Sequence, residues 1–393
     1  MATESLIVSL ARTPIGSFQG VLSSIPTVRL GAAVIKSAIE RAGIDSAHVN
    51  EVIMGNVLSA GEGQAPARQA SIYAGLPKSV ESMTINKVCG SGLKSVMLAD
   101  QAIRCEDADV IVAGGMENMS QSPYYLMDAR DGMRLGHKKL VDSLIQDGLW
   151  DPYGNMHMGN CAEVLAKEEN YSREEQDNFA IESYRRSMEA IDKGYFKDEI
   201  TPVVVSQRKG DPLIVDTDEE PGRGNTEKIS KLRSAFEKEG TITAANASSI
   251  NDGAAALLVM SAEKLAKLNL QPICRIITQA SIAQEPLYFT TAPGKAISKV
   301  LDKSSLSIND IDLFEINEAF SNVTLAAMRD HNIPHDKVNV HGGAVSLGHP
   351  IGASGTRILV TLISALNQKD KKLGLATLCI GGGEAAAVIV EMI

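Results

Sequence analysis

The sequence predicts an α/β protein made of two similar halves that share one site. Three observations support this prediction. Short hydrophobic strands alternate with amphipathic helices at the start of the chain, the alternation returns near Thr241, and motifs of the first part recur in the last part. A charged, loop-rich segment separates the two parts. We therefore expect an N-terminal α/β half over 1–119 and 241–270, an inserted loop or lid domain over 120–240, and a C-terminal α/β half over 271–393.

The first part of the chain predicts strands and helices in alternation. Apolar runs predict strands over 6–10, 52–54, 83–88 and 109–113. Apolar residues three and four positions apart predict helices over 27–41 and 93–103, the first of which stops near Gly43. Because the strands alternate with helices, we expect a parallel sheet covered on both faces. Further along, 173–193 predicts a long charged helix.

Three motifs recur in the same order roughly 265 residues further along the chain. The segment 43–52 resembles 305–314, and the segment 112–117 resembles 379–384. Between these motifs, the glycine turn at Cys89 precedes a helix, and so does the glycine turn at His349. Two such halves predict a pseudo-twofold with an active site between them.

Composition excludes several classes of function. With 44% hydrophobic and 22% charged residues, the 393-residue chain is typical of a soluble globular protein of two or three domains. The net charge of −10 disfavours general nucleic-acid binding. No apolar run approaches the ~18–20 residues of a membrane span. The termini show no secretory, transit or peroxisomal signal, so we expect a cytoplasmic protein.

The five cysteines do not form a structural framework. They are odd in number, far apart, and never spaced as C-x-x-C, which disfavours disulfides and a zinc site. We therefore expect no metal. Cys105, Cys161 and Cys274 have ordinary apolar neighbours and are expected to be buried small side chains.

Cys89 is a candidate nucleophile. It follows a predicted buried strand and precedes a helix, where free N–H groups favour a thiolate. Gly90 and Gly92 permit a sharp turn and the close approach of a ligand. A free thiol is only a few per cent ionised at neutral pH, so Cys89 also needs a base. A structural cysteine in a tight turn is the alternative.

His349 is the candidate base, because it lies on the glycine-rich turn of 341–352, beside the second α/β half. Cys379 ends a strand before Gly381, where exposed N–H groups can form an oxyanion hole. Asn317 also follows an apolar strand, at the edge where α/β sheets place function. The alternative for Cys379 and Asn317 is a strand cap. Together the residue types suit thioester chemistry, in which a thiolate accepts an acyl group.

These motifs together resemble the thiolase family, and specifically its biosynthetic members, over essentially the whole chain. The resemblance is carried by the segments 86–92, 114–120, 246–254, 317–320, 342–355 and 379–383. It implies a thiolase-like fold and an acyltransferase. The implied activity is acetyl-CoA C-acetyltransferase, the reversible Claisen condensation of two acetyl-CoA to acetoacetyl-CoA plus coenzyme A.

The resemblance also implies a role for each candidate residue. Cys89 carries the acetyl group, and His349 activates it. Cys379 is the acid/base that removes the α-proton of the second acetyl-CoA. Asn317 holds a water that binds one thioester oxygen together with His349. The backbone N–H groups of Cys89 and Gly381 form a second oxyanion hole.

Substrate length depends on other residues. By resemblance, the pair His157 and Met158 roofs a short acyl pocket, while 285–289 differs from many bacterial members and is expected to reshape the wall. Arg223 and Lys228 are candidates for the nucleotide end, and Glu384 departs from the family pattern and is expected to be structural. Positions that match the lining for pantetheine and adenine are Leu149, Phe236, Ala244, Ser248, Ala319 and Phe320.

Two alternatives remain open at this point. The first is a degradative 3-ketoacyl-CoA thiolase with the same catalytic residues and a longer acyl tunnel. The second is a non-catalytic thiolase-like binding protein, which we would expect to lack one of the two cysteines or the histidine. The expected ligands are acetyl-CoA, acetoacetyl-CoA and coenzyme A, with no cofactor besides these. By resemblance, 122–139 is an oligomerisation loop, and we expect a homotetramer built as a dimer of dimers.

Overall fold

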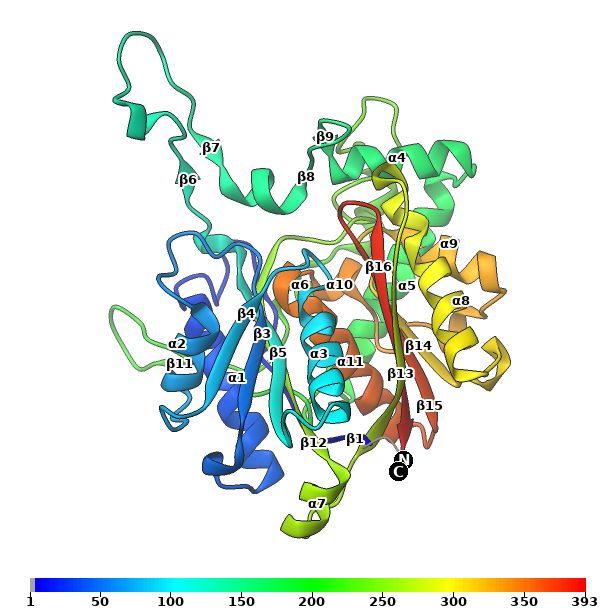
Figure 1. Cartoon of the computed structure of the whole chain (residues 1–393). Helices are drawn as coiled ribbons and strands as arrows, with labels where there is room; N and C mark the ends of the chain where they lie inside the picture. Colours follow the sequence, from blue (N-terminus) through cyan, green and yellow to red (C-terminus); the bar gives the residue numbers. More distant parts are fainter. Residues whose placement is uncertain (1–3) are drawn as a thin grey trace.

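The computed structural model describes residues 4–393 and has five layers. Helices α1 and α2 cover the outer face of one sheet, and α8 and α9 cover the outer face of the other (Figure 1). Helices α3 and α11 lie side by side between the two sheets. The middle layer is therefore shared by both halves, which matters because both of its helices begin next to candidate catalytic residues.

The N-terminal half contains the first sheet and its helices. Its main elements are β1 (Ser5–Arg12), α1 (Thr27–Ala42), β3 (Glu51–Gly55), α2 (Pro66–Tyr73), β4 (Glu81–Ile85), α3 (Ser91–Arg104), β5 (Val110–Asn118), β12 (Asn251–Ser261) and α7 (Ala262–Leu268), with the short β2 (Gly16–Ser17) beside β12. The predicted strands and helices occur close to their expected places, and α1 ends at Gly43 in the left-handed conformation.

The C-terminal half repeats this arrangement. Its elements are β13 (Cys274–Ala283), α8 (Ala292–Ser304), β14 (Leu313–Ile316), α9 (Ser321–His331), α10 (Ala344–Leu347), α11 (Ile351–Gln368), β15 (Leu373–Ile380) and β16 (Glu384–Met392). Strand β3 runs parallel to β5, and β14 runs parallel to β15 in the corresponding place. The predicted α/β class with two similar halves is thus confirmed.

The sheets of the two halves are the two parts of one ten-stranded sheet, with the order β14-β15-β16-β13-β1-β12-β5-β3-β4 and with β2 paired to β12. The two halves join where Leu6 and Ile7 of β1 pair with β13. The expectation of a parallel sheet was wrong in part, because β12 and β16 each return antiparallel to their neighbours. The strand before Cys89 is also not buried, since β4 is an edge strand with alternating exposure.

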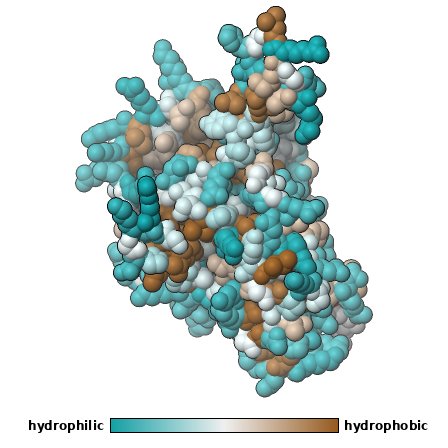
Figure 2. Space-filling view, turned by 90° about the vertical axis from the view of Figure 1, so that its left-hand side faces the viewer, coloured by the Kyte–Doolittle hydropathy of each residue, from teal (hydrophilic) through white to brown (hydrophobic). Residues whose placement is uncertain are grey.

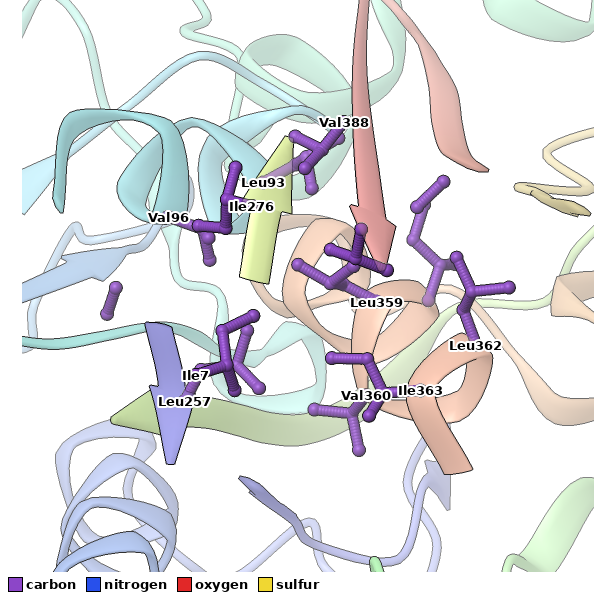
Figure 3. Close-up of a cluster of buried hydrophobic side chains, with 14 of the residues drawn as sticks. Ile7, Leu93, Val96, Leu257, Ile276, Leu359, Val360, Leu362, Ile363 and Val388 are labelled. Atoms are coloured by element: carbon purple, nitrogen blue, oxygen red, sulfur yellow. The ribbon is translucent and has the colours of Figure 1, made fainter. Parts of the chain in front are cut away.

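The core between the sheets is built on α11. Every residue from Ile351 to Leu366 is buried, as expected for a helix with apolar neighbours on all sides. Figure 3 shows Leu359, Leu362 and other side chains of α11 in the same cluster as Leu93 and Val96 of α3. The hydrophobic core thus fixes the two helices against each other.

The helices α3 and α11 approach most closely near their N-terminal ends. A Cβ added to Gly355 would lie 2.2 Å from the backbone nitrogen of Leu93, and one added to Gly92 would lie 2.7 Å from that of Thr356. Real Cβ atoms do not come this close to backbone, so both positions require glycine. This contact brings the turns before the two helices, which hold Cys89 and His349, to the same place.

The segment between β5 and β12 forms the insertion. It contains β6 (Tyr124–Tyr125), β7 (Val141–Asp142), β8 (Trp150–Asp151), β9 (Met156–His157), α4 (Met158–Glu168), α5 (Arg173–Asp192), β10 (Val203–Val205), β11 (Leu213–Val215) and α6 (Glu219–Arg223). The part that carries β6 and β7 projects as an arm at the upper left of Figure 1. Within residues 4–393, no helix has the length and apolar character needed to cross a membrane.

The cysteines behave mostly as expected. Cys161 and Cys274 are buried, as predicted, and burial raises the pKa of Cys161 to about 11. The prediction for Cys105 was wrong. This residue caps the C-terminal end of α3 and is exposed, because the helix ends at the surface just before β5.

Candidate active site

A cavity of about 250 Å³ opens between the two halves, at the ends of β4 and β15. It brings together many of the side chains predicted from the sequence: Cys89, Leu149, His157, Met158, Phe236, Ser248, Ala319, Phe320, His349, Cys379 and Gly381. Phe289, from the segment 285–289, also lines it, and so do six residues that were not candidate site residues: Met119, Gly148, Ala247, Ser249, Ile250 and Ile351. One site therefore contains both candidate cysteines and the candidate base.

Cys89 lies on a tight turn between β4 and α3. The preceding residue, Val88, has φ +47°, a left-handed conformation that is strained for a β-branched residue. The turn is held because Lys87 N–H donates to the Oγ of Ser91 at 2.8 Å, and Ser91 Oγ–H donates to the carbonyl of Val88 at 2.7 Å. The strained backbone of Val88 thus sets the direction of the chain at Cys89.

The sulfur of Cys89 faces backbone N–H groups from both halves. Burial raises the pKa of the Cys89 thiol to about 11, while the N–H groups of Gly381 and of Cys89 itself act in the opposite direction. We expected the start of the helix to favour a thiolate, but burial outweighs it here. The resting group is a neutral thiol, so its attack on a thioester requires a base.

Cys379 is fully buried at the end of β15, paired with Ala385 of β16. Burial raises the pKa of Cys379 well above its usual range, and the negative charge that Cys89 can carry raises it further. The two thiols therefore influence each other's ionisation and do not both become thiolates at once. Acylation of Cys89 would prevent it from ionising, so Cys379 would then be the one of the two cysteines that can become a thiolate.

His349 is held on its glycine turn by Asn251. The Oδ1 of Asn251 accepts the backbone N–H of His349 at 2.9 Å. Gly348 has φ +105°, and a Cβ there would lie 2.3 Å from the Asn251 side chain, so glycine is required for two reasons. Burial lowers the pKa of His349 to about 3, so its imidazole is neutral at pH 7 and can accept a proton.

Each ring nitrogen of His349 has a neighbour. Nδ1 lies 2.6 Å from the Oγ of Ser354, and Nε2 lies 3.5 Å from Nδ2 of Asn317. Asn317 follows β14, where its backbone N–H donates to the carbonyl of Thr377 at 3.0 Å. Its Oδ1 is buried and has no hydrogen-bond partner among residues 4–393. Asn317 thus presents a polar oxygen beside the imidazole.

Comparison with known proteins identifies the family. The model of the thiolase N-terminal domain matches residues 5–263, and that of the thiolase C-terminal domain matches residues 270–392. The chain belongs to the thiolase family. It is therefore an acyltransferase enzyme.

Relatives of this thiolase match it over almost their full length. The chain is 54% identical to an acetyl-CoA acetyltransferase of Pseudomonas aeruginosa, with 98% of each chain covered. It is 52% identical to the mitochondrial acetyl-CoA acetyltransferase of Mus musculus, covering 99% of this chain and 91% of the mouse protein. The predicted family and fold are thus confirmed.

Solved structures agree. The Acat5 thiolase of Ascaris suum, crystallised in complex with coenzyme A, superimposes with a TM-score of 0.94 at 44% identity, with coverage of 99% of this chain and 100% of that one. The acetyl-CoA acetyltransferase of Bacillus anthracis superimposes with a TM-score of 0.97 at 39% identity, with coverage of 100% and 99%.

One wall of the thiolase cavity is apolar and aromatic, and it packs in the same hydrophobic cluster as Cys379. The ring of His157 stacks on Phe236 at 4.9 Å, and Phe236 meets Phe320 edge-on at 6.1 Å. Burial lowers the pKa of His157, whose Nδ1 accepts the N–H of Gly159 at the start of α4. This side chain therefore acts as a neutral ring in the wall.

The unusual segment 285–289 reaches the same wall. Its last residue, Phe289, is buried and packs against Phe320, with the ring centroids 6.4 Å apart. The expectation that this segment shapes the pocket thus agrees with its position. The sequence contained the departure from the family pattern, but it did not show which of the five side chains faces inward.

Three residues expected along coenzyme A lie outside the cavity wall. Ala244 and Lys228 are exposed, and Arg223 forms an ion pair with Glu219 at 3.4 Å. Their proposed contacts concern the nucleotide, which would extend beyond this cavity, so these assignments stay predictions.

Glu384 has a defined partner in this thiolase. It forms an ion pair with Lys87. Lys87 is two residues before Cys89 and Glu384 is three residues after Gly381, so the pair joins the two halves near both residues. The pair is partly exposed, which limits its contribution to stability to about 1 kcal/mol or less. Its place supports the structural role that we expected for Glu384.

Proposed function

We propose that this thiolase is an acetyl-CoA C-acetyltransferase that condenses two acetyl-CoA to acetoacetyl-CoA plus coenzyme A, reversibly and through an acetyl-Cys89 intermediate. The observation that carries the proposal is the convergence of Cys89, Cys379 and His349 on one cavity, with the Gly381 N–H facing the Cys89 sulfur. Condensation needs a nucleophile, a second base and oxyanion donors, and this cavity contains each type.

In the first half-reaction, the Cys89 sulfur attacks the thioester carbon of acetyl-CoA while Nε2 of His349 takes the thiol proton. The N–H groups of Cys89 and Gly381 donate to the developing oxyanion. The carbon–sulfur bond to coenzyme A then breaks, and the departing thiolate takes the proton of the Cys379 thiol, which leaves Cys379 as a thiolate and His349 protonated. Acetyl-Cys89 and free coenzyme A are the products.

In the second half-reaction, Cys379 as a thiolate removes an α-proton from a second acetyl-CoA. The high pKa of Cys379 makes its thiolate a strong base, and the acetylated Cys89 can no longer ionise and oppose the charge of that thiolate. The enolate oxygen accepts from the Nε2–H of the protonated His349, with Asn317 beside it. The α-carbon attacks acetyl-Cys89, the carbon–sulfur bond to Cys89 breaks, and the Cys89 thiolate takes back the proton of His349 as acetoacetyl-CoA forms.

The apolar wall supports a short acyl chain. Met158, His157 and Phe289 bound a cavity of about 250 Å³, which must also admit the end of pantetheine. Steady-state thiolysis tests the assignment, with acetoacetyl-CoA compared against 3-ketohexadecanoyl-CoA. We expect a clear preference for acetoacetyl-CoA. Equal turnover of the two substrates would instead assign a degradative 3-ketoacyl-CoA thiolase.

The projecting arm supports a homotetramer, built as a dimer of dimers. Its exposed apolar side chains include Tyr124, Met127, Leu135 and Leu140, and Figure 2 shows brown side chains at the tip of the arm above the body of the molecule. Apolar groups that project in this way are typical of an interface. Light scattering on the intact chain and on a variant with 127–139 replaced by a short glycine-serine linker tests this. We expect tetramers to become dimers.

A further inference from the structure

The reaction proposed above requires one particular form of the His349 imidazole. To take the Cys89 proton, the ring must have a bare lone pair on Nε2, so its single proton must be on Nδ1. A neutral imidazole in water can carry its proton on either nitrogen. Some group next to Nδ1 must therefore decide the tautomer.

In many proteins with a catalytic histidine, a carboxylate next to Nδ1 fixes the tautomer. Within residues 4–393 no carboxylate is bonded to His349, and its pKa is lowered by burial and then by the charge of Arg357. The atom that faces Nδ1 is the Oγ of Ser354, at 2.6 Å. Ser354 is fully buried in the first turn of α11, five residues after the histidine.

The hydroxyl of Ser354 has a defined direction. Its Oγ lies 2.8 Å from the carbonyl oxygen of Pro350, which can only accept, so the hydroxyl proton points there. The oxygen lone pairs of Ser354 are then left for His349, and Nδ1 must donate. On the other side, the neighbour of Nε2 is Nδ2 of Asn317, a donor that requires a bare nitrogen.

We propose that Ser354 is the positioning residue that holds the proton of His349 on Nδ1 and leaves Nε2 free to act as the base. This role rests on the proposed function. A serine acceptor differs from a carboxylate because it selects the tautomer without adding negative charge. In the resting protein the imidazole is thus neutral.

The direct test is ¹⁵N NMR of the intact protein with labelled histidines, with the His349 signals assigned by their loss in His349→Gln. We expect the wild-type spectrum at pH 7 to show protonated Nδ1 and unprotonated Nε2. In Ser354→Ala we expect a mixture of the two tautomers, and in Ser354→Thr, which keeps the hydroxyl, a return towards the wild-type form. A wild-type ring protonated on Nε2 overturns the proposal, even if no variant folds.

Kinetics supply the second readout. Ser354→Ala should lower kcat for thiolysis of acetoacetyl-CoA roughly 10- to 100-fold, with little change in KM, and Ser354→Thr should recover most of the loss. Ser364→Ala, on the same helix but far from the histidine, is the matched control and should keep wild-type kcat. Wild-type kcat in Ser354→Ala overturns the proposal. If the wild type does not cleave acetoacetyl-CoA at all, the proposed function fails, and the NMR result still decides the tautomer.

Discussion

The backbone N–H of Gly381 faces the sulfur of Cys89, although the two residues come from opposite halves of the chain. Cys89 follows β4 in the first half, and Gly381 follows β15 in the second. The nucleophile and one oxyanion donor are therefore aligned only when the halves are packed together. The close contact of α3 with α11 and the ion pair of Lys87 with Glu384 both hold this alignment.

Two substitutions at Gly381 distinguish loss of its N–H donor from the effect of adding a side chain. A Cβ added to Gly381 would meet Met158 at 3.5 Å and Val88 at 3.6 Å, which are ordinary contacts. Gly381→Ala should therefore keep most activity, because it keeps the N–H. Gly381→Pro removes the donor and should lower kcat by about 10²–10³-fold. Equal activity of the two variants, with equal thermal stability, would show that the N–H is not an oxyanion donor.

Chain-length preference should depend on Met158. Its side chain lines the cavity beside Gly381, so Met158→Ala should lengthen the acyl pocket. We expect the ratio of kcat/KM for 3-ketohexanoyl-CoA to that for acetoacetyl-CoA to rise at least severalfold, since one methylene in an apolar pocket changes binding by ~1–3 kcal/mol. An unchanged ratio would place the length limit elsewhere in the wall.

His341 should make the fold sensitive to acid. It is buried against Tyr195, and burial lowers its pKa to about 4. Between pH 6.5 and 4 the unfolded chain protonates this group while the folded chain does not. The contribution of His341 to the free energy of unfolding is therefore fully present above pH 6.5. It is lost as the pH falls towards 4, by about 1.4 kcal/mol per pH unit. His341→Gln, followed by urea denaturation from pH 7 to pH 5, should show a smaller loss than the wild type. Parallel pH dependences in the two proteins would contradict this.

Much of the fold could be predicted from local patterns. The apolar runs and the spacing of the helices predicted most elements of the first half, and in the second half the strands before Asn317 and Cys379 and the helix after the His349 turn, because strands and helices have different hydrophobic periods. The antiparallel return of β12 and β16 could not be predicted, since an apolar strand has the same pattern in either direction. The exposure of Cys105 depended on where α3 reaches the surface, which no neighbouring residue reveals.

Cys89, His349 and Cys379 could be singled out from the sequence because each lies on or just before a glycine turn. A residue such as Ile250 lacks such a signal, because an apolar residue in a cavity wall has the same local sequence pattern as one in the core. The thiolate expected at Cys89 was wrong for the resting protein, since burial outweighs the start of the helix.

Cys89 and Cys379 have different roles, and one variant of each cysteine tests its role separately. Cys89→Ala removes the acceptor of the acetyl group but leaves Cys379 in place. Cys379→Ser keeps the acceptor and removes the base for the α-proton. Each step contributes about 10²–10⁴-fold to the rate, so the losses should be easy to distinguish.

The measurement is a paired assay on each variant, with radiolabelled acetyl-CoA for acetylation of the protein and deuterated water for α-proton exchange. Cys89→Ala should not become acetylated. Cys379→Ser should still become acetylated, but its α-proton exchange should fall by several orders of magnitude. The account is contradicted by acetylation of Cys89→Ala, or by exchange at the wild-type rate in Cys379→Ser.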